Sequence, residues 1–197
     1  MKYLKKSKIM GELEYSNSPI IFESFYILER EFMQNNIDVV KKAIKGNRRA
    51  YYSLIREYTP YLYKIAFLHT KYEEDAKSIF EETIYNSFKN IHKLKHPDKF
   101  KIWITRILIN EIDYFLESTG MVESEVEIKS NTNNIDLYKS IDILETKIKS
   151  VIILRYYCDF KVEEIGEILD LNQSTVNTYA RRGFKEMKEL LKEECVC

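Results

Sequence analysis

The chain has 197 residues, which is enough for one domain or two small ones. Hydrophobic residues make up 45% and charged residues 31%, a balance that indicates folded cores and excludes a disordered chain. Only 5 Gly and 3 Pro are present and strand-like alternation is scarce, so we predict an all-α fold. The sequence contains neither a run of about 18 apolar residues nor a secretory signal, so we expect no membrane span.

Charge is divided unevenly along a chain whose 31 basic and 31 acidic side chains balance to zero. Between Asp38 and Leu116 there are fifteen Lys or Arg and ten Asp or Glu, whereas between Glu117 and Asp142 there are two basic and six acidic residues. A basic segment attracts polyanions such as nucleic acid. The pattern is typical of a DNA-binding protein that contains an acidic connector.

Neither a metal nor another cofactor is expected. The three cysteines are odd in number and have no framework spacing, which argues against a disulfide scaffold and for a reducing compartment, the cytoplasm (Cys158, Cys195 and Cys197). The last two do not make a closed zinc site, because structural zinc takes four ligands. The three histidines do not cluster with other ligands, and we expect them on the surface or in loops (His69, His92 and His96).

The first half of the chain contains several predicted helices. Residues 1–36 form an N-terminal extension whose apolar stretch is compatible with one amphipathic helix. From Ile37 onward helical spacing is clear, with Asp38 as a predicted cap and Gly46 as a stop. The next helix contains Pro60, which predicts a kink or a break.

Two further helices complete this half. One runs from about Glu73 to Ile91 and has small and apolar residues on its inner face. The loop Lys93–Asp98 separates it from the next, which carries Trp103 as a predicted core anchor. We predict a domain of residues 37–117, followed by a flexible acidic linker of residues 118–139, too polar to order itself.

Residues 140–194 are predicted to form a second, smaller helical domain that contains a helix-turn-helix. Its first helix is Val162–Leu169, its turn is Asp170–Asn172, and its second helix opens with Gln173. Short polar side chains at the start of the second helix suit contacts with phosphates and base edges in a major groove. Basic residues farther along this helix could follow the DNA backbone.

Both halves resemble sigma factors of bacterial RNA polymerase, of the extracytoplasmic-function type. Ser150–Tyr157, Glu163–Leu169 and Ser174–Val176 resemble sigma region 4, in which the helix-turn-helix reads the upstream promoter element. Glu74–Ile84 and Leu94–Asn110 resemble the polymerase-docking helix and the promoter-melting segment of sigma region 2. The resemblance covers residues 37–116 and 140–194, about two thirds of the chain.

The resemblance implies three sets of binding residues and core RNA polymerase and promoter DNA as partners, with an anti-sigma factor as a further candidate partner. The set for polymerase docking is Glu74, Asp75, Lys77, Ser78, Glu81 and Glu82. The set for the opened strand of the promoter is Lys93, Lys95, His96, Lys99, Lys101, Arg106 and Asn110. The set for the upstream element is Gln173, Ser174, Thr175, Asn177, Thr178, Arg181, Arg182 and Lys185.

The sequence also departs from the family pattern. Glu81 stands where members typically have Gln, Glu117 follows the melting helix where they have a basic cluster, and Asn177 stands where they have a basic residue. Two alternatives therefore stay open: a helix-turn-helix regulator that acts without polymerase, and a degenerate sigma-like interaction protein. No nucleophile, phosphate-binding loop or acid–base pair accompanies these motifs, so we expect no enzyme activity and no catalytic residue.

Overall fold

The structure is a computed structural model that describes residues 37–120 and 137–193. All regular structure within these ranges is helical, which confirms the predicted all-α fold. The N-terminal extension, most of the predicted linker, and Cys195 and Cys197 lie outside the described residues. The described residues from Val39 onward form one compact unit.

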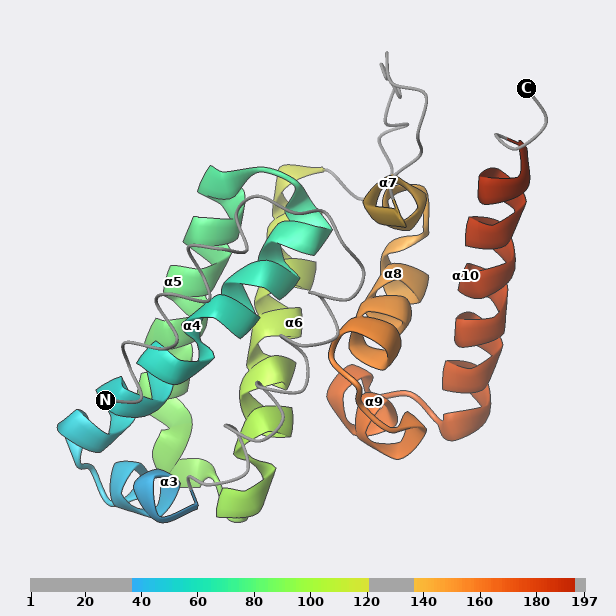
Figure 1. The fold of residues 1–197 in the computed structure, drawn as a ribbon. Coiled ribbons are helices and arrows are strands. Elements are labelled where there is room, and N and C mark those ends of the chain that lie inside the picture. The colour runs from blue at the N-terminus through green and yellow to red at the C-terminus, as the bar shows by residue number, and fades with distance from the viewer. Residues whose placement is uncertain (1–36, 121–136, 194–197) are drawn as a thin grey trace, which may run out of the picture. The chain divides into compact units, whose positions relative to one another are not determined.

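Residues 37–120 contain four α-helices and two short 3₁₀ turns (Figure 1). They are α3 (Ile37–Ile44), α4 (Arg48–Thr70), α5 (Glu73–Asn90), η1 (Ile91–Lys93), η2 (Pro97–Lys99) and α6 (Phe100–Thr119). The predicted stop of the first helix is found at Gly46, which has a left-handed φ of 88°.

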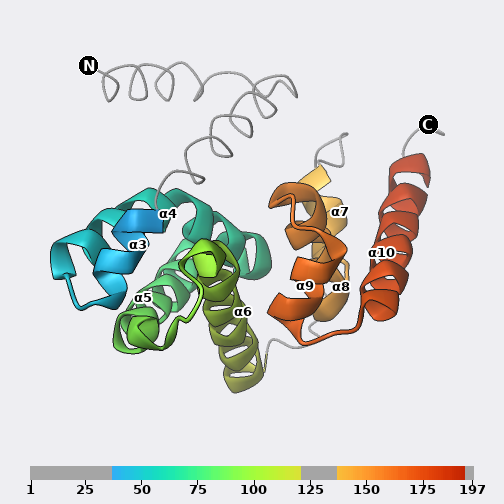
Figure 2. The ribbon, with the colours of Figure 1, turned by 90° about the horizontal axis from the view of Figure 1, so that it is seen from below.

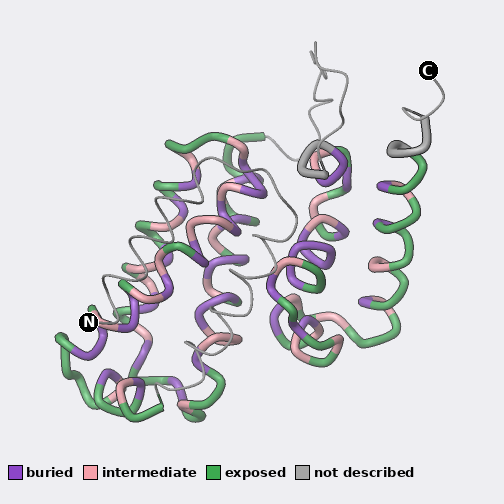
Figure 3. Tube along the Cα trace, in the orientation of Figure 1, coloured by how far each residue is buried: buried purple, intermediate pink, exposed green. Residues whose placement is uncertain are grey.

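Residues 137–193 contain four α-helices and one π-helical turn (Figure 2). They are α7 (Leu137–Asp142), α8 (Thr146–Ile152), η4 (Ile153–Tyr157), α9 (Val162–Leu169) and α10 (Gln173–Glu193). Figure 3 shows α10 buried along one side and exposed along the other, as expected of an amphipathic helix.

The helix α4 continues through Pro60, so the predicted break is wrong. Proline removes one backbone hydrogen bond and crowds the preceding turn. Here Pro60 is exposed, while Tyr58, Tyr61 and Leu62 around it are buried. Burial of apolar area on both sides of the proline offsets the lost hydrogen bond.

Small polar residues on the inner face of α5 allow close contact with α4. The Tyr51 hydroxyl donates to the Ile84 carbonyl (2.8 Å) and lies 2.7 Å from the Ser87 hydroxyl. Thr83 is fully buried and donates to the Ile79 carbonyl (2.8 Å). These buried polar groups therefore cost little, because each has a hydrogen-bond partner.

The helix-turn-helix forms where the sequence predicted it. Asp170 ends α9 with a left-handed φ of 55°, and the backbone N–H of Leu171 donates to the Gly166 carbonyl (3.0 Å). A Cβ at Gly166 would lie only 2.6 Å from the Leu171 carbonyl oxygen, so the tight turn requires glycine there. Asn172 caps α10 by accepting from the Thr175 backbone N–H (2.8 Å).

The end of α4 contacts α8 through His69, whose predicted surface position is wrong. Its side chain is buried and lies 2.8 Å from the Ile65 carbonyl and 3.0 Å from the Ser150 hydroxyl. Burial lowers the pKa of His69 to about 4; Lys149 and Lys71 act in the same direction, and the bond to Ile65 opposes it. The imidazole is therefore neutral at pH 7.

Three further charged groups lie at this contact. Lys71 is paired with Asp142 of α7. Burial lowers the pKa of Lys149, Asp142 raises it and Lys71 lowers it. A protonated His69 would therefore lie near two cations, Lys71 and Lys149, and one carboxylate, Asp142. That carboxylate already pairs with Lys71.

Acidification is expected to destabilise the fold through His69. Its pKa rises from about 4 to 6.5 on unfolding, so the unfolded chain takes up the proton first as the pH falls. The stabilisation is complete above pH 6.5 and is lost toward pH 4, by on the order of 3 kcal/mol. Urea unfolding should show a smaller loss between pH 7 and pH 5 in His69→Gln, which still forms hydrogen bonds but does not titrate. The exposed His92→Gln is the control, and equal pH dependence of His69→Gln and the unmodified chain would refute this role.

Candidate nucleic-acid interface

A basic hollow lies at the start of α6. Lys93, Lys95, His96, Lys99 and Arg106 line it together with Leu94, Ile102, Trp103 and Glu167. Sequence analysis placed the five basic or histidine side chains in the strand-binding set, and the structure brings them together. Lys95 and His96 are exposed, and Lys93 donates to the Asn90 side chain (2.7 Å). Their role in DNA binding stays a prediction.

Trp103 forms an apolar side of this hollow. It is half-buried, and its ring lies 5.8 Å from the ring of Phe100, which is buried and packs edge-on against Tyr58 at 5.1 Å. The tryptophan is therefore anchored to the core through Phe100, while part of its side chain stays accessible. A half-buried aromatic beside cations is a suitable surface for an unstacked base.

Lys99 is held by the second half of the chain. Its ammonium lies 2.7 Å from a carboxylate oxygen of Glu167, which belongs to α9. The hydrogen bond and charge of Glu167 raise the pKa of Lys99 above its ordinary value. Figures 1 and 2 show α9 beside α6, on the side away from α5.

Lys101 is also in contact with the second half. It donates to the Cys158 carbonyl (3.3 Å), and its ammonium lies 4.8 Å from the centre of the Phe160 ring and 5.2 Å from that of Tyr61. Two aromatic faces and a carbonyl give a favourable environment for a cation. Lys101 is therefore half-buried at the contact with the second half of the chain. Sequence analysis placed Lys101 in the strand-binding set and did not predict this contact.

Arg106 and Asn110 lie farther along the same side of α6. Both are exposed and line a second hollow with Asp113, Lys147 and Asp170. Burial and Glu117 raise the pKa of Asp113, while Lys147 opposes this. The basic side of α6 thus becomes mixed in charge toward its C-terminus.

The predicted docking set is displayed along the outer side of α5. Glu74, Lys77, Ser78, Glu81 and Glu82 are exposed, whereas Asp75 is half-buried. Sequence analysis missed two exposed aromatics one and two turns beyond Glu81: Tyr85 is 56% exposed and Phe88 is 39% exposed. Their helical spacing from Glu81 is the signal that could have identified them.

The start of α10 presents most of the set predicted for the upstream element. Gln173, Ser174, Asn177, Thr178 and Arg181 are exposed. Thr175 is half-buried, and its hydroxyl donates to the Asn172 side chain (2.9 Å). The Ser174 hydroxyl donates to the same oxygen (2.6 Å). The hydroxyls of both residues thus belong to the helix cap, which sequence analysis did not anticipate.

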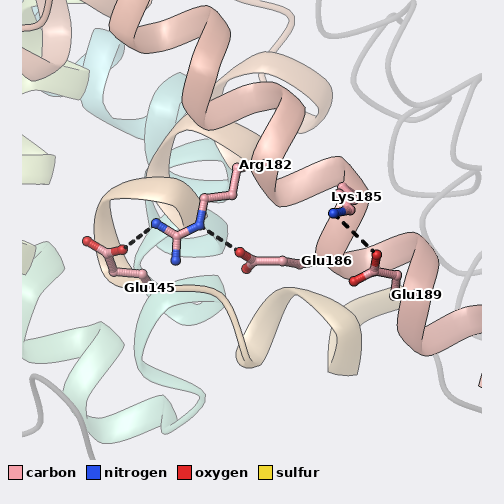
Figure 4. Close-up of polar contacts among 5 residues, drawn as sticks. All are labelled: Glu145, Arg182, Lys185, Glu186 and Glu189. Carbon is pink, nitrogen blue, oxygen red and sulfur yellow. Dashed lines mark hydrogen bonds and ion pairs between the residues drawn. The ribbon is translucent and has the colours of Figure 1, made fainter.

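Two basic residues farther along α10, Arg182 and Lys185, are paired with carboxylates, as Figure 4 shows. Arg182 lies 2.7 Å from Glu186 and 3.4 Å from Glu145, and Lys185 lies 3.7 Å from Glu189. Glu186 raises the pKa of Arg182. All these side chains are at least partly exposed, so the pairs are weak and can exchange with other anions.

Other types of site are not found in the part of the chain that the structure describes. There, no group of three or more His, Cys, Asp or Glu side chains is arranged to hold a metal ion. None of the helices from α3 to α10 combines the length and apolar character needed to cross a membrane.

Family models match both halves of the chain. The model of sigma-70 region 2 matches residues 54–120, and the model of sigma-70 region 4 matches residues 135–187. These ranges contain α5, the basic hollow, α6 and the helix-turn-helix.

Known sigma factors are similar to this chain. The RNA polymerase sigma factor SigV of Bacillus subtilis (strain 168) is 31% identical over 142 residues, 67% of this chain and 86% of that protein. The ECF RNA polymerase sigma factor SigW of the same organism is 23% identical over 179 residues, 78% of this chain and 95% of that one.

A solved structure shares the fold. It is the sigma factor RpoE in complex with the anti-sigma factor NepR from Bartonella quintana, with a TM-score of 0.61 and 18% identity over 71% of this chain and 95% of that one. Together with the two family models and the identity to SigV, this assigns the chain. It belongs to the sigma-70 family, as an extracytoplasmic-function sigma factor that binds core RNA polymerase and directs transcription initiation at promoters.

Proposed function

We propose that three surfaces of this sigma factor have separate roles in transcription initiation. The outer side of α5 docks on core polymerase, the basic hollow at the start of α6 holds the opened promoter strand, and the start of α10 reads the upstream duplex. The observation that best supports the proposal is the basic hollow, which cationic side chains line together with Trp103. The mechanism is binding and positioning, and it requires no catalytic residue.

Capture of a single strand needs cations for the backbone and an aromatic or apolar surface for the bases. Lys95, His96 and Arg106 are exposed at the hollow and supply hydrogen-bond donors, and Trp103 supplies a ring. A base that leaves the helical stack loses stacking energy, and contact with the ring returns part of it. Melting would thus be driven by binding of the separated strand.

The start of α10 supports reading of duplex DNA. A helix N-terminus carries partial positive charge and unpaired N–H groups, and both favour a phosphate. Gln173, Asn177 and Arg181 are exposed on successive turns, with side chains long enough to reach base edges or phosphates. Duplex DNA can therefore be approached by the first turns of α10.

Other predictions on organisation and partners form part of this proposal. We retain a domain of residues 37–117, a linker of residues 118–139 and a domain of residues 140–194. RpoE from Bartonella quintana is in complex with an anti-sigma factor, so we propose that this chain also has an anti-sigma partner. The cytoplasmic location stays a prediction. The family models match both halves, so a regulator that acts without polymerase has no support.

Arg181→Ala should weaken binding to promoter duplex by about tenfold and reduce the slope of affinity against salt by about one, because one phosphate contact is lost. Arg182→Ala is the matched variant. It should have a smaller effect, because Glu186 and Glu145 already pair with Arg182. Binding of both variants, together with core polymerase, is measured by fluorescence anisotropy at several salt concentrations. A larger effect of Arg182→Ala would show that the DNA contacts lie farther along α10.

Reversal of charge on α5 should impair polymerase binding without unfolding the chain. Glu81→Lys with Glu82→Lys places two cations on the proposed docking surface, so co-purification with core polymerase should fall at least tenfold. Both side chains are exposed, so the free energy of unfolding should change by only about 0.5 kcal/mol each. Thermal unfolding is the control for folding. Undiminished co-purification would contradict the docking assignment.

A further inference from the structure

The turn between α3 and α4 gathers exposed cations that belong to none of the three surfaces described above. Lys42 lies at the end of α3, Lys45 lies in the turn, and Arg48 and Arg49 open α4; all four side chains are exposed. Within residues 37–120 and 137–193, none of the four is paired with a carboxylate. We name these four residues, together with Tyr52, the basic corner.

The backbone of the turn fixes the arrangement of the basic corner. The Asn47 backbone N–H donates to the Lys42 carbonyl (3.0 Å), and the Asn47 side chain caps α4 by accepting from the Ala50 N–H (3.0 Å). Gly46 supplies the left-handed φ of 88° at this turn. Ala43 and Ala50 are buried on the inner side, so the cations are held together on the outer side.

Arg48 and Arg49 stand where they do not help the helix. They are the first two residues of α4, where the partial positive charge of the helix dipole repels cations, and no acidic residue lies in this first turn. The first turn of α5, by contrast, contains Glu73, Glu74 and Asp75. Residues that oppose the local preference of a helix are expected at binding sites, where a ligand compensates them. The compensating charge here is negative.

An exposed aromatic ring lies within the basic corner. Tyr52 is 62% exposed and follows Arg48 and Arg49 by one turn, so the ring and the guanidinium groups share one side of α4. Cations bind phosphates, and an exposed ring stacks with an unpaired base. A contact with the backbone of duplex DNA would use the cations but not the ring. The combination therefore favours a single strand.

The basic corner lies at the same end of the helices as the basic hollow. The ring centre of Tyr51, next to Tyr52, lies 5.0 Å from that of Phe88 in α5, and the Tyr51 hydroxyl lies 2.7 Å from that of Ser87. Phe88 is 39% exposed, and Lys93 of the hollow lies in η1, directly after α5. Figure 1 shows the turn between α3 and α4 near the end of α5 and the loop that leads to α6. A strand that leaves the hollow can reach the corner past Phe88.

We propose that the basic corner is a second contact for the opened promoter strand, beyond the hollow. Arg48 and Arg49 bind phosphates of the strand, and the ring of Tyr52 stacks with one base. The proposal rests on the strand-binding role of the hollow given above and extends it to a longer segment. Because one strand connects the two contacts, the second adds affinity without a second association step.

The test uses holoenzyme assembled from core RNA polymerase and the full chain. Fork DNA is built from a promoter that this holoenzyme transcribes. Its upstream duplex ends in a single-stranded overhang of about 4 or about 16 nucleotides, the range of single-strand site sizes. The test variant is Arg48→Gln with Arg49→Gln. The control, Lys161→Gln with Lys188→Gln, removes the same charge from exposed positions outside all proposed surfaces. Affinity is measured by fluorescence anisotropy at several salt concentrations.

A further variant identifies the strand that the hollow holds. Lys95→Gln with His96→Gln removes two exposed donors of the hollow and leaves the basic corner intact. The overhang is placed on each strand of the fork in turn. The strand whose short overhang this variant binds more weakly is the one that the hollow holds, and the long overhang is placed on that strand.

The effect of the basic corner should depend on the length of the overhang. Arg48→Gln with Arg49→Gln should bind the long fork about tenfold more weakly and the short fork like unmodified holoenzyme. The slope of log affinity against log salt should fall by about 1.4 on the long fork, at about 0.7 for each phosphate contact of a single strand. Tyr52→Ala should weaken only the long fork, by about fivefold and at an unchanged slope, whereas Tyr52→Phe keeps the ring and the affinity. The control variant should match unmodified holoenzyme at both lengths.

Other results would overturn the proposal. An equal loss at both lengths, or none, would mean that the arginines do not contact the strand beyond the hollow. An equal loss after the long overhang is paired with a complementary strand would assign them to duplex DNA. Weaker co-purification of Arg48→Gln with Arg49→Gln with core polymerase would make the corner a polymerase contact. If Lys95→Gln with His96→Gln weakens the short fork on neither strand, the proposed role of the hollow itself fails. If it weakens one strand while the arginine variant leaves the long fork unchanged, only the extension to the corner fails.

Discussion

The cations at the start of α6 need anions, aromatic faces or water beside them at all times. Much of the remaining structure follows from this requirement. The helix is fixed in the core by Ile104, Leu108 and Ile112, which are fully buried. This burial sets the direction in which Lys101 points, because Lys101 precedes these residues by one to three turns on the same side of the helix, whereas Lys99 belongs to η2 just before it. The same apolar contacts that hold α6 therefore present its cations to whichever partner is available.

In the structure that partner is the second half of the chain, and the two ends of the contact differ in strength. Near the start of α6 the contact is an exposed ion pair and a cation between two rings, which water and salt weaken. At the end of α4 it includes the buried imidazole of His69, neutral and bonded to Ser150. A buried polar group that loses its partner costs more than an exposed pair does. The strand-binding end should open more readily than the His69 end.

Most of the fold could be predicted from the sequence because helical periodicity is a local property. The predicted third helix, about Glu73 to Ile91, is observed as Glu73–Asn90, and the helix-turn-helix has the predicted helices and turn. What could not be predicted depends on partners far along the chain. His69 is buried by a bond to Ser150, 81 residues away, and Lys99 meets Glu167, 68 residues away. A kink or a break was expected at Pro60; the helix does not break there, and the burial that keeps α4 continuous is also a tertiary effect.

The residues of the candidate site could be predicted from the sequence better than their arrangement in space. The basic residues that line the hollow were recognised as one set, whereas the capping role of Asn172 and the aromatic surroundings of Lys101 were not. A cap is a short-range pattern that the sequence does contain, since Asn172 precedes Thr175 by three residues. The surroundings of Lys101 combine three elements, and no pattern within one helix reveals them.

The assignment to the sigma-70 family means that this chain directs core RNA polymerase to promoters. The most direct measurement is transcription of genomic DNA from the source organism by purified core polymerase, with and without the full chain, followed by mapping of transcript 5′ ends. We expect discrete start sites that appear only with the chain and that share two sequence elements upstream. Start sites identical to those of core polymerase alone would contradict it.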